Sequence, residues 1–257
     1  MTEIASFESQ GDGPVLLFLH GIGGNRHAFD GQLPAFADRW RAVSWDMPGY
    51  GDSAPLAQMT YATLADAVAR LLDHLDAPTA AIVGHSMGGM IAQEFVIQHP
   101  GRTSALVLSA TSPSFGKPGG EWQEWFLGQR LAPLDRGLSP ADFAHELVPA
   151  MMSDNPPEAA VAAAMASMSA LSSDTYRAAL HCLVTFNRRD KLGEIACPTL
   201  TLAGDMDEAA PAAMMEKMAS YIPDSRYHCL SGVGHLANLE DPAQFNQAIR
   251  AFLDEVA

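Results

Sequence analysis

Cysteine is scarce in this sequence, and its pattern excludes two kinds of structure. The 257 residues include three cysteines, Cys182, Cys197 and Cys229. Their number is odd, their spacing is wide and no Cys-x-x-Cys pair occurs, so the sequence predicts neither a disulfide framework nor a zinc site. Free thiols are typical of a reducing compartment.

Long apolar runs are missing as well. The longest early run, Val15–Leu19, is far too short to span a bilayer. Residues 1–10 have neither the basic start nor the apolar stretch of a secretion signal. Together with the free thiols, these absences lead us to expect a soluble, cytoplasmic protein with no membrane partner.

Basic residues are outnumbered by acidic ones. Fifteen Lys and Arg face 30 Asp and Glu, which gives a net charge of −15. Such a charge excludes binding to nucleic acid or to anionic membrane surfaces as a main function. It does not identify a substrate, and the sequence leaves the oligomeric state open. Because 48% of the residues are hydrophobic, the chain can bury the core of one large domain, with or without an insertion.

Short apolar runs alternate with amphipathic segments along most of the chain. This alternation predicts βαβ units, and hence a mostly parallel sheet with helices on both faces. The expected strands are 3–9 at an edge, then 15–19, 41–45, 79–83, 105–108, 197–203 and 225–230. The expected helices are 25–38, one starting at Thr60, 90–99, 211–221 and one from about Asp241.

The alternation stops for about eighty residues in the middle of the chain. Residues 112–190 contain no convincing strand, but they contain four candidate helices near 121–131, 140–152, 157–171 and 173–187. We therefore predict a core domain made of residues 1–111 and 191–257. Residues 112–190 form a helical insertion between two strands of its sheet.

The segment Gly84-His-Ser-Met-Gly-Gly89 separates an expected strand from an expected helix. A Gly-x-Ser-x-Gly sequence in this position is typical of a nucleophile elbow, a sharp turn that lifts a serine hydroxyl clear of the sheet. Glycines are needed at Gly84 and Gly88 because a Cβ there would collide where the helix meets the strand. The helix N-terminus would present the Met87 N–H to an anion.

Reactive residues follow three further strands. One strand leads to His20-Gly-Ile-Gly-Gly24, one to Gly204-Asp-Met-Asp-Glu208, and one to Ser231-Gly-Val-Gly-His235. The carboxyl ends of parallel strands meet at one edge, so these groups should converge with Ser86. His235 has the pKa range of a base that activates Ser86, and a carboxylate would orient its imidazole. The N–H groups of Ile22 and Met87 would form an oxyanion hole.

With these motifs and Asp46-Met-Pro-Gly-Tyr-Gly51, the chain resembles the α/β-hydrolase superfamily. Within it, Pro198–Gly204 and Gly232–Asn238 look most like the serine-nucleophile branch of 3-oxoadipate enol-lactonases and small carboxylesterases. The resemblance implies an α/β-hydrolase fold, a lid formed by residues 112–190, and Asp207 as the triad acid rather than Asp205 or Glu208. Only one strand fits before His20, so we expect about seven strands where eight are usual.

The resemblance implies a serine hydrolase that cleaves a small carboxylic ester or lactone through an acyl-enzyme on Ser86, with no metal or other cofactor. Haloalkane dehalogenase and epoxide hydrolase chemistry is not expected, because Ser86 occupies the position where those enzymes have Asp. Three alternatives stay open. They are a carbon–carbon bond hydrolase of ring-cleavage products, a cofactor-free perhydrolase, and a ligand-binding protein that has lost turnover.

Aromatic and methionine side chains of the insertion are expected to line an apolar pocket that adapts its shape. The predicted pocket residues are Trp122, Trp125, Phe126, Phe143 and Met151. Five arginines lie in or beside the insertion: Arg130, Arg136, Arg177, Arg188 and Arg189. We expect them on the solvated surface, and therefore a preference for neutral esters. Pairing of one arginine with a substrate carboxylate is the alternative that an enol-lactonase would require.

Overall fold

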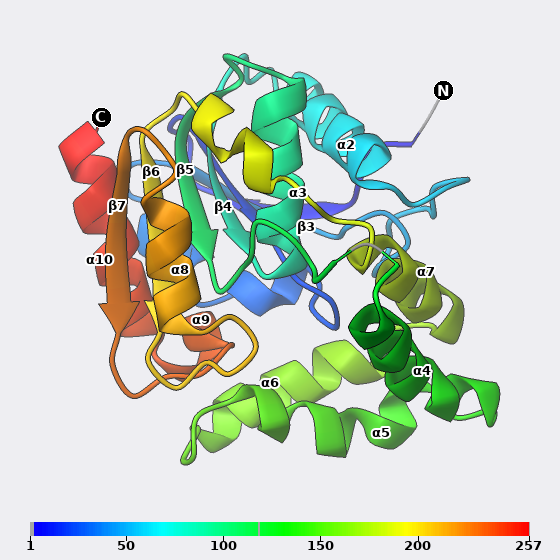
Figure 1. Cartoon of the computed structure of the whole chain (residues 1–257). Helices are drawn as coiled ribbons and strands as arrows, with labels where there is room; N and C mark the ends of the chain where they lie inside the picture. Colours follow the sequence, from blue (N-terminus) through cyan, green and yellow to red (C-terminus); the bar gives the residue numbers. More distant parts are fainter. Residues whose placement is uncertain (1–2, 118, 257) are drawn as a thin grey trace.

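The computed structural model describes residues 3–117 and 119–256 and contains one seven-stranded sheet (Figure 1). Residues 1–2, 118 and 257 fall within the predicted core and insertion ranges but lie outside the described residues. The strands are β1 (Phe7–Gln10), β2 (Val15–Leu19), β3 (Arg41–Trp45), β4 (Ala80–His85), β5 (Thr103–Ser109), β6 (Thr199–Gly204) and β7 (Ser225–Leu230). Their order is β1-β3-β2-β4-β5-β6-β7, and only the β1–β3 pair is antiparallel. The predicted mostly parallel sheet of about seven strands is confirmed.

The sheet is buried on both faces because its strands are apolar at successive positions. On β2, Leu17 and Leu19 enter one hydrophobic cluster, whereas Leu16 and Phe18 enter the other. Helices α2 (Tyr61–His74), α3 (Met87–Gln98) and α8 (Ala212–Ala219) pack on the first face. The segments η1 (Arg26–Phe29), α1 (Leu33–Phe36) and α10 (Pro242–Val256) pack on the second. Each fully buried Leu or Phe contributes about 1.5–3 kcal/mol to folding, so both layers hold the strand ends firmly in place.

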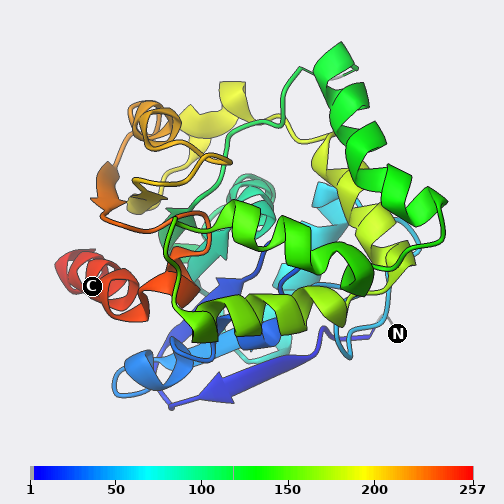
Figure 2. The same ribbon diagram turned by 90° about the horizontal axis from the view of Figure 1, so that it is seen from below.

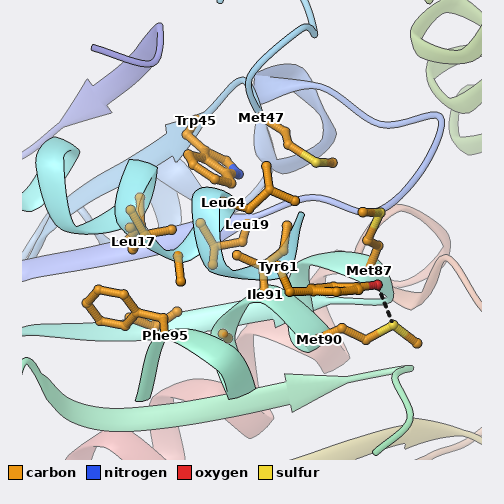
Figure 3. Close-up of a cluster of buried hydrophobic side chains, with 14 of the residues drawn as sticks. Leu17, Leu19, Trp45, Met47, Tyr61, Leu64, Met87, Met90, Ile91 and Phe95 are labelled. Carbon is orange, nitrogen blue, oxygen red and sulfur yellow. Dashed lines mark hydrogen bonds between the residues drawn. The ribbon is translucent and has the colours of Figure 1, made fainter. Parts of the chain in front are cut away.

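Side chains of β2, β3, α2 and α3 interlock in the first cluster (Figure 3). Leu64 of α2 and Ile91 of α3 lie against the strands, and the Tyr61 hydroxyl donates to the Met90 sulfur over 3.2 Å. Helix α2 starts as predicted, because the Thr60 side chain accepts a hydrogen bond from the Thr63 N–H. This packing fixes α3, the helix that follows Ser86, against the sheet.

Two segments differ from the expected helices. The helix expected over residues 25–38 is split into η1 and α1, because Gly31 favours a turn and Pro34 fits only in the first turn of a new helix. At the C-terminal end, the short helix α9 (Ala237–Glu240) precedes α10, so the chain is already helical before Asp241.

Between β5 and β6, the chain forms α4 (Glu121–Asp135), α5 (Pro140–Leu147), η2 (Pro149–Met151), α6 (Glu158–Ser169), α7 (Ser173–Leu183) and η3 (Arg189–Glu194). Apart from one bridge between Ser114 and Asn187, the described residues of this segment form no β-structure. The Phe115 N–H donates to the Phe186 carbonyl over 2.9 Å, which ties the two ends of the insertion together. Helices α5 and α6 lie beyond the ends to which the arrows of β5 and β7 point, and they cross that edge when it is viewed from below (Figures 1 and 2).

In the described part of the chain, no helix has both the length and the apolar character that crossing a membrane requires.

The junction of β4 and α3 has no space for side chains at two glycines. A Cβ on Gly88 would lie 2.0 Å from the Leu19 carbonyl oxygen, and one on Gly84 would lie 2.6 Å from the Gly88 carbonyl oxygen. These distances are far inside van der Waals contact, so the backbone of α3 packs directly on the backbone of β2. The collision that the sequence predicts at both glycines is therefore present.

We expect Gly88→Ala to lower the free energy of unfolding by about 3 kcal/mol or more, because the added methyl group would force α3 away from β2. Urea unfolding followed by circular dichroism measures the change. Gly193→Ala is the matched control, since a Cβ at Gly193 meets no atom within 4 Å. Its effect should stay within about 0.5 kcal/mol. Equal unfolding midpoints for the two variants would contradict the tight packing.

Candidate active site

Ser86 occupies the turn between β4 and α3 in a strained backbone conformation. Its φ of 52° and ψ of −119° are rare for a residue with a side chain and cost about 1–3 kcal/mol. Two hydrogen bonds, one to each backbone polar group of Ser86, hold the residue in this conformation. The Ser86 N–H donates to the Ser109 carbonyl over 2.9 Å, and the Thr111 hydroxyl donates to the Ser86 carbonyl over 2.7 Å. The Ser86 side chain therefore stands beyond the end of the sheet, where other strand ends can reach it.

Ser86, His235 and Asp207 form one hydrogen-bonded chain. The Ser86 hydroxyl lies 3.0 Å from His235 Nε2, and His235 Nδ1 lies 2.8 Å from Asp207 Oδ2. An ionised carboxylate only accepts hydrogen bonds, so Nδ1 carries the proton and Nε2 is left to accept from the serine. The three predicted residues thus come together from the ends of β4, β6 and β7.

Asp207 is held as a carboxylate by its surroundings. Its side chain is fully buried. Burial by itself would raise the pKa, but the hydrogen bond and charge of His235 and the N–H groups of Ala209 and Ala210 lower it below its ordinary value. Those two N–H groups donate to Oδ1 over 2.8 and 2.9 Å. The carboxylate is therefore ionised at neutral pH and favours the His235 tautomer described above.

The other two acidic residues of this loop lie elsewhere. Asp205 is exposed and accepts hydrogen bonds from the Gly232 N–H at 2.7 Å and the Ser231 hydroxyl at 3.2 Å. Glu208 is also exposed. Of the three candidates in the sequence, only Asp207 contacts His235.

The glycine-rich loop after β2 passes directly beside Ser86. A Cβ on Gly21 would lie 2.8 Å from the Ser86 Cβ, so only glycine allows this approach. Ile22 and Met87 both line the cavity above Ser86. Within residues 3–117 and 119–256, neither of their N–H groups donates to a protein acceptor. Two unpaired donors beside a serine hydroxyl can hold an anionic oxygen.

Two further histidines near Ser86 are buried and neutral. Burial lowers the pKa of His20 to about 4, and its ring orders the loop by donating to the Gly21 carbonyl and accepting from the Met47 N–H. Burial and the neighbouring His235 lower the pKa of His85 to about 3. The rings of His85 and His235 lie 5.0 Å apart, centroid to centroid. Among the described residues, His235 is the histidine whose ring nitrogen contacts the Ser86 hydroxyl, so it has the contacts that a general base needs.

A cavity of about 190 Å³ opens above Ser86 and His235. This volume is slightly larger than the 150 Å³ or so of an engineered cavity that binds benzene, so it fits a small substrate group. The core contributes Ile22, Met87 and Met90 to its wall. The insertion contributes mainly apolar side chains: Phe115, Phe126, Leu147, Met151, Met168, Leu180 and Leu183.

Only part of the predicted pocket set lines this cavity. Phe126 and Met151 do. Trp122 and Trp125 are 52% and 60% exposed, because residues three apart on α4 share a face and this face points to solvent. Phe143 is buried in the interior of the insertion, with its ring 5.7 Å from that of Tyr176. The prediction of Trp122, Trp125 and Phe143 as cavity residues is therefore not supported by their positions.

The backbone of the insertion also holds the loop that carries His235, a contact that no sequence pattern predicts. The His235 N–H donates to the Met151 carbonyl over 2.8 Å. The buried carboxylate of Glu240 accepts from the Ser153 N–H at 2.8 Å and from the Gly234 N–H at 3.1 Å. Glu240 lies in a polar stretch, and its partner Ser153 is 87 residues away in the chain. No periodicity or motif could therefore have identified it.

Among residues 3–117 and 119–256, no group of three His, Cys, Asp or Glu side chains is arranged to hold a metal ion. The arrangement brings a serine hydroxyl, an imidazole and two backbone N–H groups together beside an apolar cavity.

Comparison with known proteins gives consistent matches over nearly the whole chain. Residues 14–242 match the family model described as alpha/beta hydrolase fold. The 3-oxoadipate enol-lactonase 2 of Acinetobacter baylyi is 28% identical, covering 95% of this chain and 90% of the relative. The pimeloyl-[acyl-carrier protein] methyl ester esterase of Aeromonas hydrophila is 29% identical, covering 96% of this chain and 98% of the relative. A solved structure of a thermophilic esterase from Thermogutta terrifontis, with malate bound, aligns with a TM-score of 0.88 at 29% identity, covering 98% and 93% of the two chains.

We expect Glu240→Ala to lower the free energy of unfolding by about 2–4 kcal/mol, because it leaves the N–H groups of Ser153 and Gly234 buried without an acceptor. Thermal and urea unfolding measure the loss. Glu216→Ala is the control, since Glu216 is an exposed glutamate on α8. If the two variants unfold alike, the bridge between the insertion and the His235 loop contributes no stability.

Proposed function

Because the chain belongs to the alpha/beta hydrolase fold family, we propose that it hydrolyses a small carboxylic ester or lactone through an acyl-enzyme on Ser86. The observation that carries the proposal is the hydrogen-bonded chain from Ser86 through His235 to Asp207 at the base of an apolar cavity. The similar relatives named as an enol-lactonase, a methyl ester esterase and an esterase support the same type of hydrolase.

The proposed reaction begins when His235 Nε2 takes the proton of the Ser86 hydroxyl. The serine oxygen then attacks the carbonyl carbon, and the electron pair of the C=O bond moves to the carbonyl oxygen. The Ile22 and Met87 N–H groups donate to the resulting oxyanion. When the tetrahedral intermediate collapses, His235 gives its proton to the departing alkoxide. Water, activated by the same imidazole, attacks the acyl group, and Ser86 leaves with the proton.

Asp207 supports both halves of this cycle. Its ionised carboxylate accepts a hydrogen bond from the Nδ1–H of His235, which keeps the proton on Nδ1 and leaves Nε2 free to act as the base. When His235 is protonated, the buried negative charge of Asp207 stabilises the imidazolium. Asp207 therefore acts on the imidazole, while the hydroxyl of Ser86 performs the attack.

We propose that the helical insertion is the lid of this site. Its apolar side chains form much of the cavity wall, so a bound ester is shielded from water. In a water-poor cavity, the two N–H donors interact more strongly with a developing oxyanion than they would in solution.

The two enzyme alternatives from the sequence analysis use the same serine, and one set of assays separates all three alternatives. Carbon–carbon bond hydrolysis would consume ring-cleavage dienes, and perhydrolysis would need added peroxide together with a carboxylic acid or ester. A ligand-binding protein would give no burst of product from a chromogenic ester. We expect ester or lactone turnover in the absence of peroxide.

Ser86→Ala should leave the fold intact and lower kcat for a chromogenic ester by about four to six orders of magnitude, since it removes the nucleophile. A phosphonate probe should label Ser86 in the unmodified protein, with the site read by peptide mass spectrometry. Ser104→Ala, an exposed serine on β5, is the control and should keep full activity. Substantial turnover by folded Ser86→Ala protein would exclude the mechanism.

Asp207→Asn should lower kcat by about 10⁴-fold, because an amide can donate to Nδ1 and hold His235 in the wrong tautomer. Asp205→Asn makes the same chemical change two residues away, where no contact with His235 exists, and should change kcat little. Steady-state kinetics on both variants tests the assignment. If Asp205→Asn lowers kcat far more than Asp207→Asn does, Asp205 rather than Asp207 is the carboxylate that orients His235.

A further inference from the structure

Arg130 of α4 is the one permanently charged side chain among the residues that line the cavity. Its guanidinium carbon lies 5.6 Å from the ring centroid of Phe126, another cavity residue. Within residues 3–117 and 119–256, Arg130 forms neither an ion pair nor a hydrogen bond. By contrast, Arg177 pairs with Asp135 at 2.7 Å, and Arg188 pairs with Glu94. Arg130 thus keeps its five donors available on a largely apolar wall.

Tyr176 of α7 lies close to Arg130 on the same wall. The residue is 3% exposed and lines the cavity, yet its hydroxyl has no hydrogen-bond partner among the described residues. Helices α4 and α7 pack against each other, and both residues line the same cavity. Burial raises the pKa of Tyr176, and the positive charge of Arg130 opposes that rise. Because Tyr176 lines the cavity and its hydroxyl makes no hydrogen bond to the described residues, the hydroxyl is free to donate to a bound ligand.

A guanidinium and a phenol that converge on one cavity are complementary to a carboxylate. The planar guanidinium donates two parallel hydrogen bonds to the two carboxylate oxygens, and the phenol hydroxyl can add a third. The cation–π contact with Phe126 holds the guanidinium at the wall without neutralising its charge. The protein as a whole has a net charge of −15 and repels anions, so binding of a carboxylate here must come from this local pair.

We propose that the substrate is a half-ester of a dicarboxylic acid, whose free carboxylate binds Arg130 and Tyr176 while its ester carbonyl reaches Ser86. This inference rests on the proposed hydrolase function and specifies its substrate class. Hydrolysis consumes the half-ester and one water and releases the alcohol and the dicarboxylate. The assignment replaces the neutral preference expected from the sequence, in which Arg130 was placed on the solvated surface.

The test compares substrates that differ in charge but hardly in shape. The monomethyl esters of succinate, glutarate and adipate are each paired with the analogue whose free carboxylate is replaced by a carboxamide. We expect kcat/KM for the best half-ester to exceed that of its amide by about 10- to 100-fold, the range of a hydrogen bond to a charged group. Arg130→Gln should remove most of this ratio, and Tyr176→Phe should lower it several-fold.

Arg136→Gln is the matched control, because Arg136 is an exposed arginine just after the end of the same helix. It should leave the ratio unchanged. The proposal is overturned if the unmodified protein favours the amide at every chain length, or if Arg136→Gln lowers the ratio as much as Arg130→Gln does.

A binding measurement separates this inference from the hydrolase mechanism. Calorimetry of Ser86→Ala protein with the dicarboxylate product should show binding that Arg130→Gln weakens about 10- to 100-fold. If that binding is present and ester turnover does not depend on Ser86, the carboxylate site stands and the mechanism fails. If Ser86-dependent ester turnover is present and no dicarboxylate binds, the hydrolase function stands and the carboxylate site is overturned.

Discussion

The site depends on the direct contact between the backbones of α3 and β2. Gly88 has no space for a side chain against the Leu19 carbonyl, so the N-terminus of α3 lies on the strand that leads into the glycine-rich loop. This contact brings the turn that carries Ser86 directly beside Gly21, so that Ile22, Ser86 and Met87 line the same cavity. The packing of α2 and α3 on the sheet holds Ser86 in its strained conformation and offsets the energy of that strain (Figure 3).

His235 is held from two directions, and one of them is the helical insertion. The Nδ1–H of His235 donates a hydrogen bond to Asp207, and the backbone N–H of His235 donates to the Met151 carbonyl. Glu240 joins Gly234 to Ser153 and so fastens the same loop to the insertion a second time. Movement of the 151–153 segment would therefore move the imidazole. In this protein the segment above the cavity also contributes to the position of the base.

The cavity combines an apolar wall with one local cation. Methionine and aromatic side chains surround the serine, and they exclude water without fixing a single ligand shape. In the proposed carboxylate site, Arg130 and Tyr176 would give this wall a preferred direction, because their donors would favour a carboxylate at one position. The strongly negative surface affects the approach of an anion from a distance, whereas this pair acts at hydrogen-bond range. The surface charge would thus affect how often an anionic substrate reaches the protein, whereas the proposed Arg130–Tyr176 site would affect which substrate binds.

The sheet, the order of its elements and the placement of Ser86, Asp207 and His235 at strand ends could be predicted from the sequence. These features rest on local rules: buried strands are short apolar runs, and parallel strands bring their carboxyl ends to one edge. Which side chains of the insertion face the cavity depends on how its helices pack. Trp122, Trp125 and Phe126 are equally apolar in sequence, yet Phe126 and Arg130 line the cavity while both tryptophans are exposed. Trp122 stacks on Phe126, one helical turn further from the cavity wall. Glu240 and Ser153 meet for the same kind of reason, since contact across 87 residues depends on how whole helices pack and not on any neighbouring residue.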